Sequence, residues 1–200
     1  MWPNFDPKPY TQAEWIAHVN SIDFAQWGKN PYARSHKPLF ITVHNTSLPT
    51  LKMWAESGPA HDARLQNLQS YYQKNLGWHA GPHAFISRNF INGFSQLNVP
   101  GVHASCFNAV SIGLEMVGDY DTEEFTTGDG ALVRANAVCA VAALHNALDI
   151  DPLPYVYGVS GIHFHQECKR DNHACPGKKV IKDDFVKAVQ AEMIRQKAFT

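Results

Sequence analysis

The sequence predicts one mixed α/β domain in which a central sheet is flanked by helices. Two apolar segments rich in β-branched residues, 38–44 and 109–117, are typical of buried strands. Residues 129–148 form a long, Ala-rich segment that is apolar nearly all round, as expected of a mostly buried helix. The chain of 200 residues suffices for one domain, and it contains no repeat, linker or low-complexity tract.

Capping signals and the spacing of apolar residues predict the elements of the first half. Thr11 and Glu14 have the spacing of a capping box, so a short helix is predicted behind a Pro-rich lead-in. Residues 38–44 form the first core strand, begun by a proline. Residues 62–75 carry apolar side chains at helical spacing, and Gly77 ends this second helix.

The second half adds strands and the terminal helices. Residues 83–88 and 91–97 are two short candidate strands, and 109–117 is the strongest central-strand signal. The buried helix at 129–148 follows, and an amphipathic pattern predicts a terminal helix over residues 183–197. We therefore place a single domain over residues 1–200, with a core at about 39–179, an N-terminal lead-in at 1–37 and a C-terminal helical segment at 180–200.

Charge and hydropathy exclude several classes of partner. Lys and Arg number 17 and Asp and Glu 18, so the formal charge is −1, which argues against broad electrostatic binding of nucleic acid or of anionic membranes. We find no run of about 18 to 20 apolar residues, so no membrane insertion is expected. The N-terminus lacks the basic and apolar regions of a signal peptide, so we expect synthesis in the cytoplasm.

The four cysteines are too few and too scattered to predict a disulfide framework. We expect free thiols, with Cys106 and Cys139 as buried small hydrophobic side chains. Histidine is unusually frequent, with eleven residues. Since histidine is the commonest metal ligand and the commonest acid or base near neutral pH, its positions become the central question.

Metal-ligating residue types are concentrated near the C-terminus. Three histidines and two cysteines occur within thirteen residues: His163, His165, Cys168, His173 and Cys175. Zinc would satisfy such a group through imidazole and thiolate ligands. Taken alone, the cluster fits a closed structural site of two His and two Cys, part of an open catalytic site, or an exposed polar loop.

Two residues elsewhere in the chain bear on this choice. His44 ends the first core strand, at the edge where α/β sheets usually bind ligands. Glu115 lies inside an apolar strand, where a carboxylate requires a partner or a function. His44, Glu115 and the His/Cys cluster together have the composition of a hydrolytic zinc centre, with three protein ligands and a carboxylate.

At these positions the sequence resembles the zinc-dependent N-acetylmuramoyl-L-alanine amidases, a type-2 amidase fold that includes amidase-type phage lysozymes and peptidoglycan recognition proteins. The resemblance extends from about residue 39 to about residue 179. The matching pieces, in the family's order, are the strand ending at His44 and Asn45; Gly81, Pro82 and His83; His103 and Ala104; residues 111–115; and His165 through Cys175, Pro176 and Gly177.

The resemblance implies one zinc ion per chain, held by His44, His165 and Cys175. It assigns Glu115 as the general base. His173 falls where many members carry a lysine; as an imidazolium it could stabilise the oxyanion or protonate the leaving amine.

The resemblance also implies a substrate groove. Asn45 would hydrogen-bond the peptide stem, and His83 and His103 would either line the groove or be structural residues. Pro82 falls where phage lysozymes often have a catalytic tyrosine, so that contribution is absent. His163 is favoured as a structural or supporting residue beside the ligand His165.

The implied activity is hydrolysis of the amide between N-acetylmuramic acid and L-alanine in peptidoglycan or muropeptides. A phage or prophage endolysin acting on the wall after release through a pore, a cytoplasmic recycling amidase and an exported antibacterial effector all fit. One alternative is a non-catalytic peptidoglycan-binding module of the same fold. Another is a structural zinc protein that uses Cys168 and Cys175, although Cys168 is favoured as a free thiol.

Overall fold

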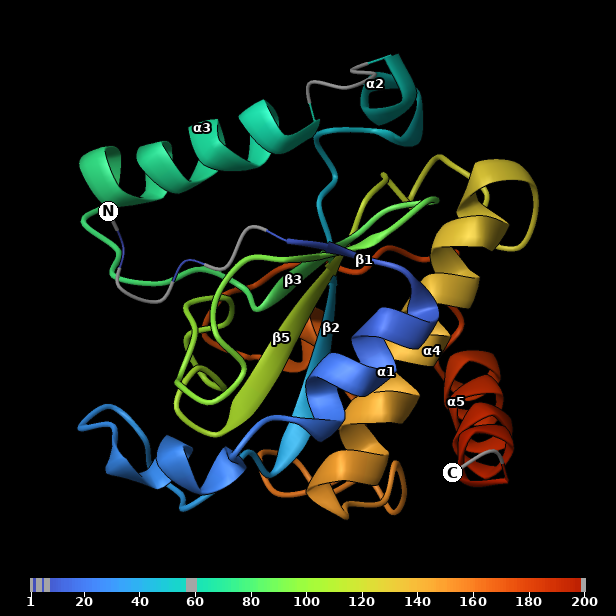
Figure 1. Ribbon diagram of the computed structural model, residues 1–200. Coiled ribbons are helices and arrows are strands. Elements are labelled where there is room, and N and C mark those ends of the chain that lie inside the picture. The colour runs from blue at the N-terminus through green and yellow to red at the C-terminus, as the bar shows by residue number, and fades with distance from the viewer. Residues whose placement is uncertain (1, 3–4, 6–7, 57–60, 199–200) are drawn as a thin grey trace.

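The structure is a computed structural model that describes residues 2, 5, 8–56 and 61–198 (Figure 1). Its helices are α1 (Gln12–Asn20), α2 (Leu51–Glu56), α3 (His61–Asn75), α4 (Gly128–Leu148) and α5 (Lys182–Lys197). Its strands are β1 (Pro9–Tyr10), β2 (Phe40–Asn45), β3 (Ala84–Ile86), β4 (Ile91–Gly93), β5 (Ser111–Met116) and β6 (His163–Phe164). The described residues therefore confirm the predicted mixed α/β fold, with one sheet and flanking helices.

The sheet has the strand order β1-β4-β3-β5-β2-β6. Strands β3, β5, β2 and β6 pair in parallel, with β6 at one edge of the sheet. Toward the other edge, β4 pairs antiparallel with β3, and β1 pairs antiparallel with β4. In the register of β2 and β5, His44 lies opposite Glu115. Parallel pairing brings the carboxyl ends of β2, β5 and β6 to the same edge of the sheet, where ligands usually bind.

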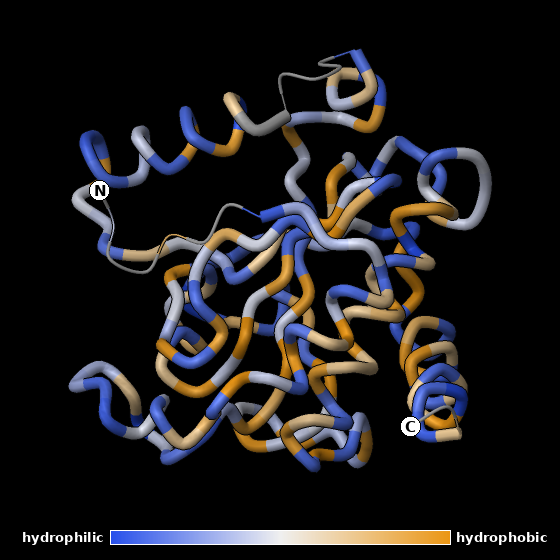
Figure 2. Tube along the Cα trace, in the orientation of Figure 1, coloured by the Kyte–Doolittle hydropathy of each residue, from blue (hydrophilic) through white to orange (hydrophobic). Residues whose placement is uncertain are grey.

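Alternation along the strands divides their side chains between two faces. Ile41 and Val43 of β2 join Ile112 and Leu114 of β5 in the main core, which α4 covers. Figure 2 shows the hydrophobic residues of these central elements. The residues that alternate with them, such as His44 of β2 and Glu115 of β5, therefore point to the other face. The core and the candidate site thus lie on opposite faces of the sheet.

Helices α1, α4 and α5 lie together on the core face (Figure 1). The predicted capping box is present at α1, where Glu14 accepts the Thr11 backbone N–H and the Thr11 hydroxyl accepts the Glu14 N–H. On the opposite face, Trp54 of α2 and Leu65 of α3 pack with Phe85 of β3 in a second apolar cluster. This cluster places α2 and α3 beside the candidate site.

The membrane-span expectation needs one correction. By length and composition alone, α4 is apolar enough to cross a membrane, because its small and aliphatic residues outweigh its few charges. Yet 61% of its apolar window is buried against the sheet and the neighbouring helices. Helix α4 is therefore a core helix whose composition is also compatible with a membrane span.

Several predicted elements differ in extent from those observed. The predicted strand at 91–97 is shorter, because β4 ends at Gly93 and Ser95 forms only an isolated bridge with Phe5. The sequence also gave no sign of β1, α2, β6 or a 3₁₀ helix at Phe24–Lys29. Strands of two residues have no alternation to detect, so β1 and β6 follow only from their pairing in the sheet.

The expectation of free thiols is wrong for two of the four cysteines. Cys106 and Cys168 form a disulfide, with their Cα atoms 5.5 Å apart and a sequence separation of 62. The bond joins the loop before β5 to the segment after β6. Cys139 is a buried free thiol, as expected, and Cys175 is also free.

Candidate metal centre

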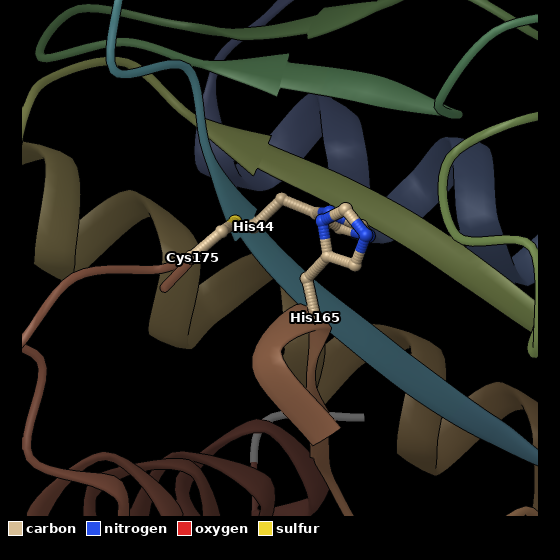
Figure 3. A group of neighbouring side chains, drawn as sticks. All are labelled: His44, His165 and Cys175. Atoms are coloured by element: carbon tan, nitrogen blue, oxygen red, sulfur yellow. The ribbon is translucent and has the colours of Figure 1, made fainter. Parts of the chain in front are cut away.

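Three side chains converge from three segments at the carboxyl edge of the sheet (Figure 3). His44 comes from β2, His165 from the 3₁₀ turn directly after β6, and Cys175 from the loop that follows. Their potential ligand atoms all lie within 4.8 Å of one another. The structure thus brings together the three residues that the sequence suggested as metal ligands.

The donor set fits a zinc ion. Imidazole nitrogen and thiolate sulfur are preferred zinc ligands, and three of them on a cavity leave a position for water or substrate. One ring nitrogen of His44 is hydrogen-bonded to His103 and one of His165 to Asp171, both at 3.0 Å, so each histidine keeps one nitrogen for an ion. The Cys175 sulfur accepts the backbone N–H of Asn45 at 3.1 Å, a contact that favours a thiolate.

Burial sets the protonation of this group. Burial lowers the pKa of His44 well below its usual value, so its imidazole is neutral and able to bind a metal. Burial also raises the pKa of the Cys175 thiol, and metal binding would release its proton. Burial raises the pKa of Glu115 to about 8, and one of its oxygens lies 3.8 Å from Nδ1 of His44.

A cavity of about 560 Å³ opens beside these residues. His165, Cys175 and Glu115 line it. Helices α2 and α3 add a mostly apolar surface, which comprises Met53, Leu68 and Tyr72 beside Arg64. The cavity therefore joins candidate metal ligands to a surface suited to the less polar parts of a ligand.

Two other residues that the sequence suggested for the site, His173 and Asn45, line the cavity. His173 lines the cavity, and its ring stacks on His165 at 4.5 Å with an interplanar angle of 23°. Asn45 lines the cavity as well, and its side-chain amide donates to the Gly118 carbonyl at 3.1 Å. Their catalytic and substrate-binding roles stay predictions.

The structure places His83 and His103 away from the cavity, which favours the structural alternative for both residues. Both are buried, with exposed fractions of 0% and 9%, and neither lines the cavity. His83 accepts the Gly113 N–H and donates to the Val99 carbonyl, both at 3.0 Å. His103 contacts His44 instead of the cavity. The resemblance suggested that these residues could lie at the groove, but their rings turn inward.

The remaining residues of the His/Cys cluster have structural roles. His163 is fully buried, stacks on Phe40 at 3.9 Å and accepts the Gly158 N–H at 2.9 Å. Cys168 is bonded to Cys106, so the structural zinc site with Cys168 as a ligand is ruled out in this structure.

Sequence reasoning missed two groups at the site. The apolar wall of α2 and α3 gave no chemical signal of its own. Asp171, which hydrogen-bonds His165, lies inside the His/Cys cluster, and its carboxylate six residues after a ligand could have drawn attention.

Comparisons with known proteins agree with this geometry. A family model described as N-acetylmuramoyl-L-alanine amidase matches residues 34–178. Peptidoglycan-recognition protein SC2 of Drosophila melanogaster is 26% identical over 180 residues, covering 84% of this chain and 86% of the relative.

Two solved structures show the same fold. Drosophila PGRP-LB superimposes with a TM-score of 0.56 at 20% identity, over 73% of this chain and 78% of that one. The N-acetylmuramoyl-L-alanine amidase LysC from Clostridium intestinale gives a TM-score of 0.53 at 18% identity, over 76% and 85% of the two chains. Since the family model spans well over half of the sequence, the chain belongs to the N-acetylmuramoyl-L-alanine amidase family.

Proposed function

We propose that this protein is a zinc-dependent amidase that hydrolyses the bond between N-acetylmuramic acid and L-alanine in peptidoglycan or its fragments. The observation that carries the proposal is the group of His44, His165 and Cys175 beside a cavity that His165, Cys175 and Glu115 line. One zinc ion per chain fits these ligands, and a bound zinc supplies an activated water and polarises the scissile carbonyl.

Glu115 is placed to move the proton. Its carboxylate lies at the cavity, beside a ligand histidine, where it can accept a proton from the attacking water on Oε1. A nearby cation would favour the ionised form of this carboxylate against the effect of burial. Once protonated, the same buried carboxyl group is a suitable donor to the departing amine.

His173 would act on developing charge. Its ring lines the cavity and stacks on His165, so an imidazolium there would stabilise negative charge that develops beside the metal ligands. Asn45 would bind the peptide stem from the adjacent strand end. The apolar wall formed by Met53 and Leu68 would hold the rest of the ligand.

The substrate class has support from related structures. A mutant of Drosophila PGRP-LB is described in complex with tracheal cytotoxin, and PGRP-LE in complex with the same monomeric diaminopimelic acid-type peptidoglycan. A muropeptide is therefore the ligand we propose for this cavity. The enzyme would act either on soluble muropeptides in the cytoplasm or on the cell wall after release, and comparing cleavage of the two substrates separates these settings.

A peptidoglycan-binding module without catalysis is the second candidate. It is favoured by the similarity to peptidoglycan-recognition protein SC2 and by the histidine at position 173, where a lysine is common in the family. It predicts muropeptide binding without release of peptide.

The two candidates are separated by measuring zinc content and cleavage together. We expect one zinc ion per chain. We also expect purified muropeptides to release a peptide with a free N-terminal L-alanine, which mass spectrometry detects. Glu115→Gln should keep the zinc but lose cleavage by about 10²-fold or more, because the general base is absent. Asp151→Asn, a change at an exposed carboxylate, serves as the matched control. Zinc-loaded wild-type protein that binds muropeptides without cutting them would establish the recognition module instead.

A further inference from the structure

One short segment, residues 103–106, contacts His44 directly through His103 and is linked to His165 through Asp171, which Ser105 holds. We infer that this segment, together with Asp171, fixes the ring orientation and tautomer of His44 and His165, so that His103 and Asp171 are positioning residues for the metal. The inference rests on the zinc site proposed above.

The contact with His44 determines which of its nitrogens can bind an ion. Nε2 of His103 lies 3.3 Å from the carbonyl oxygen of Ser111, which can only accept, so this nitrogen carries the proton. Nδ1 of the neutral His103 is then an acceptor, and it lies 3.0 Å from Nε2 of His44. His44 must therefore donate through Nε2, which leaves the lone pair of its Nδ1 for a metal.

His103 can occupy this place because β5 has a glycine beneath it. A Cβ atom at Gly113 would lie only 2.2 Å from Cγ of His103, far closer than atoms in contact. The side chain of Asn108 holds the segment from the other side, by accepting the backbone N–H groups of His103 and Ala104 at 2.8 Å each. The ring is thus fixed by packing and by the backbone together.

The contact with His165 follows the same logic. Nε2 of His165 lies 3.0 Å from Oδ2 of Asp171, and an ionised carboxylate can only accept. His165 therefore donates through Nε2 and keeps Nδ1 for the metal. Asp171 is itself held by Ser105, whose backbone N–H donates to Oδ2 at 2.8 Å and whose hydroxyl donates to Oδ1.

The disulfide ties the two segments together next to these contacts. Cys106 follows Ser105 directly and is bonded to Cys168, whose backbone N–H donates to the His165 carbonyl at 2.8 Å. The Asp171 N–H in turn donates to the Cys168 carbonyl at 3.1 Å. The covalent bond therefore holds Ser105 in reach of Asp171.

The zinc affinity measures directly how much His103 and Asp171 contribute to metal binding. Loss of a hydrogen-bond partner behind a ligand typically weakens metal binding by about 10- to 100-fold. We expect Asp171→Ala and His103→Ala each to raise the zinc Kd by about this factor, measured by competition with a chromophoric chelator. Asp171→Asn and His103→Gln should recover part of the loss, because both restore a hydrogen-bond acceptor for the ligand histidine.

Two further measurements exclude a merely structural effect. Cobalt-substituted Asp171→Ala should keep its thiolate charge-transfer band, because Cys175 is intact, while its d–d bands shift as the imidazole reorients. Thermal unfolding of the metal-free proteins, with Asp151→Asn as control, identifies any variant that fails to fold. Should His103→Ala fail, Asp171→Ala still decides, because its side chain lies in a surface loop and is 19% exposed.

The outcomes separate this inference from the proposed function. Wild-type zinc affinity in both folded alanine variants, within about twofold, with unshifted cobalt bands would overturn the positioning roles and leave the zinc site intact. A wild-type protein that binds no zinc would overturn both. Weakened binding with partial recovery in Asp171→Asn and His103→Gln supports the inference.

Discussion

His145 is a fully buried histidine of α4 whose protonation should destabilise the metal-free protein in acid. Its Nδ1 donates to the Ile150 carbonyl at 3.0 Å, and its Nε2 has no hydrogen-bond partner among the residues that the structure describes. A second proton would thus place a charged N–H group in the core without an acceptor. This burial lowers the pKa of His145 to about 4 from its usual value of 6.5.

The sign and size of the effect follow from proton linkage. Between these two pKa values the unfolded chain binds a proton that the native protein does not, so stability falls as the pH falls. The shift corresponds to about 3 kcal/mol when complete, of which about 2 kcal/mol is lost by pH 5. That is a large part of a typical stability of about 5–15 kcal/mol.

The assay is urea unfolding of the protein in EDTA, at pH 7 and pH 5, for the wild type and His145→Gln. The glutamine keeps an amide donor but does not titrate. Burial lowers the pKa values of His83 and His163 to about 4 as well, so acid should still weaken the variant. We expect the variant to lose about 2 kcal/mol less than the wild type between the two pH values. Equal losses in the two proteins would refute the reasoning.

Three further predictions concern the site and its support. Gly113→Ala should lower the free energy of unfolding by about 1–3 kcal/mol and also weaken zinc binding, because its Cβ would lie 2.2 Å from Cγ of His103. Thermal unfolding measures the first effect and chelator competition the second. Unchanged values of both would contradict the packing described. Replacing Cys106 and Cys168 together by alanine should cost about 2–4 kcal/mol in urea unfolding, because the bond closes a loop between residues 62 apart. Leu68→Ala should raise KM for muropeptides by about tenfold or less with little change in kcat, since this apolar side chain lines the cavity from α3 and carries no reacting group. An equal loss in kcat would place it at the reacting bond.

Local patterns were sufficient for the long elements of this fold. The apolar patterns of β2, β5 and α4 lie in consecutive residues, so these elements could be predicted without knowledge of the rest of the chain. The disulfide could not be read in this way. Its cysteines are 62 residues apart, and only the adjacency of β5, β2 and β6 brings their loops together.

At the site, the sequence indicated which residues gather but not which way each one faces. His103 and His173 both lie in segments that reach the centre, and both were candidates to meet substrate or reacting groups. His103 instead points inward, because Gly113 leaves room for its ring, while His173 stacks over His165 at the cavity. Asp171 depends on Ser105 from another loop, so its role required the folded chain.

The register of β2 and β5 connects the core to the chemistry. His44 lies opposite Glu115 in the pair, while Val43 and Leu114 lie opposite each other one residue earlier and face α4. A slip of one residue in β2 would exchange its two faces. It would bury His44 against α4, away from His165 and Cys175, and expose Val43 to the cavity. The burial of the aliphatic residues therefore fixes the register, and the same register holds the histidine and the carboxylate side by side.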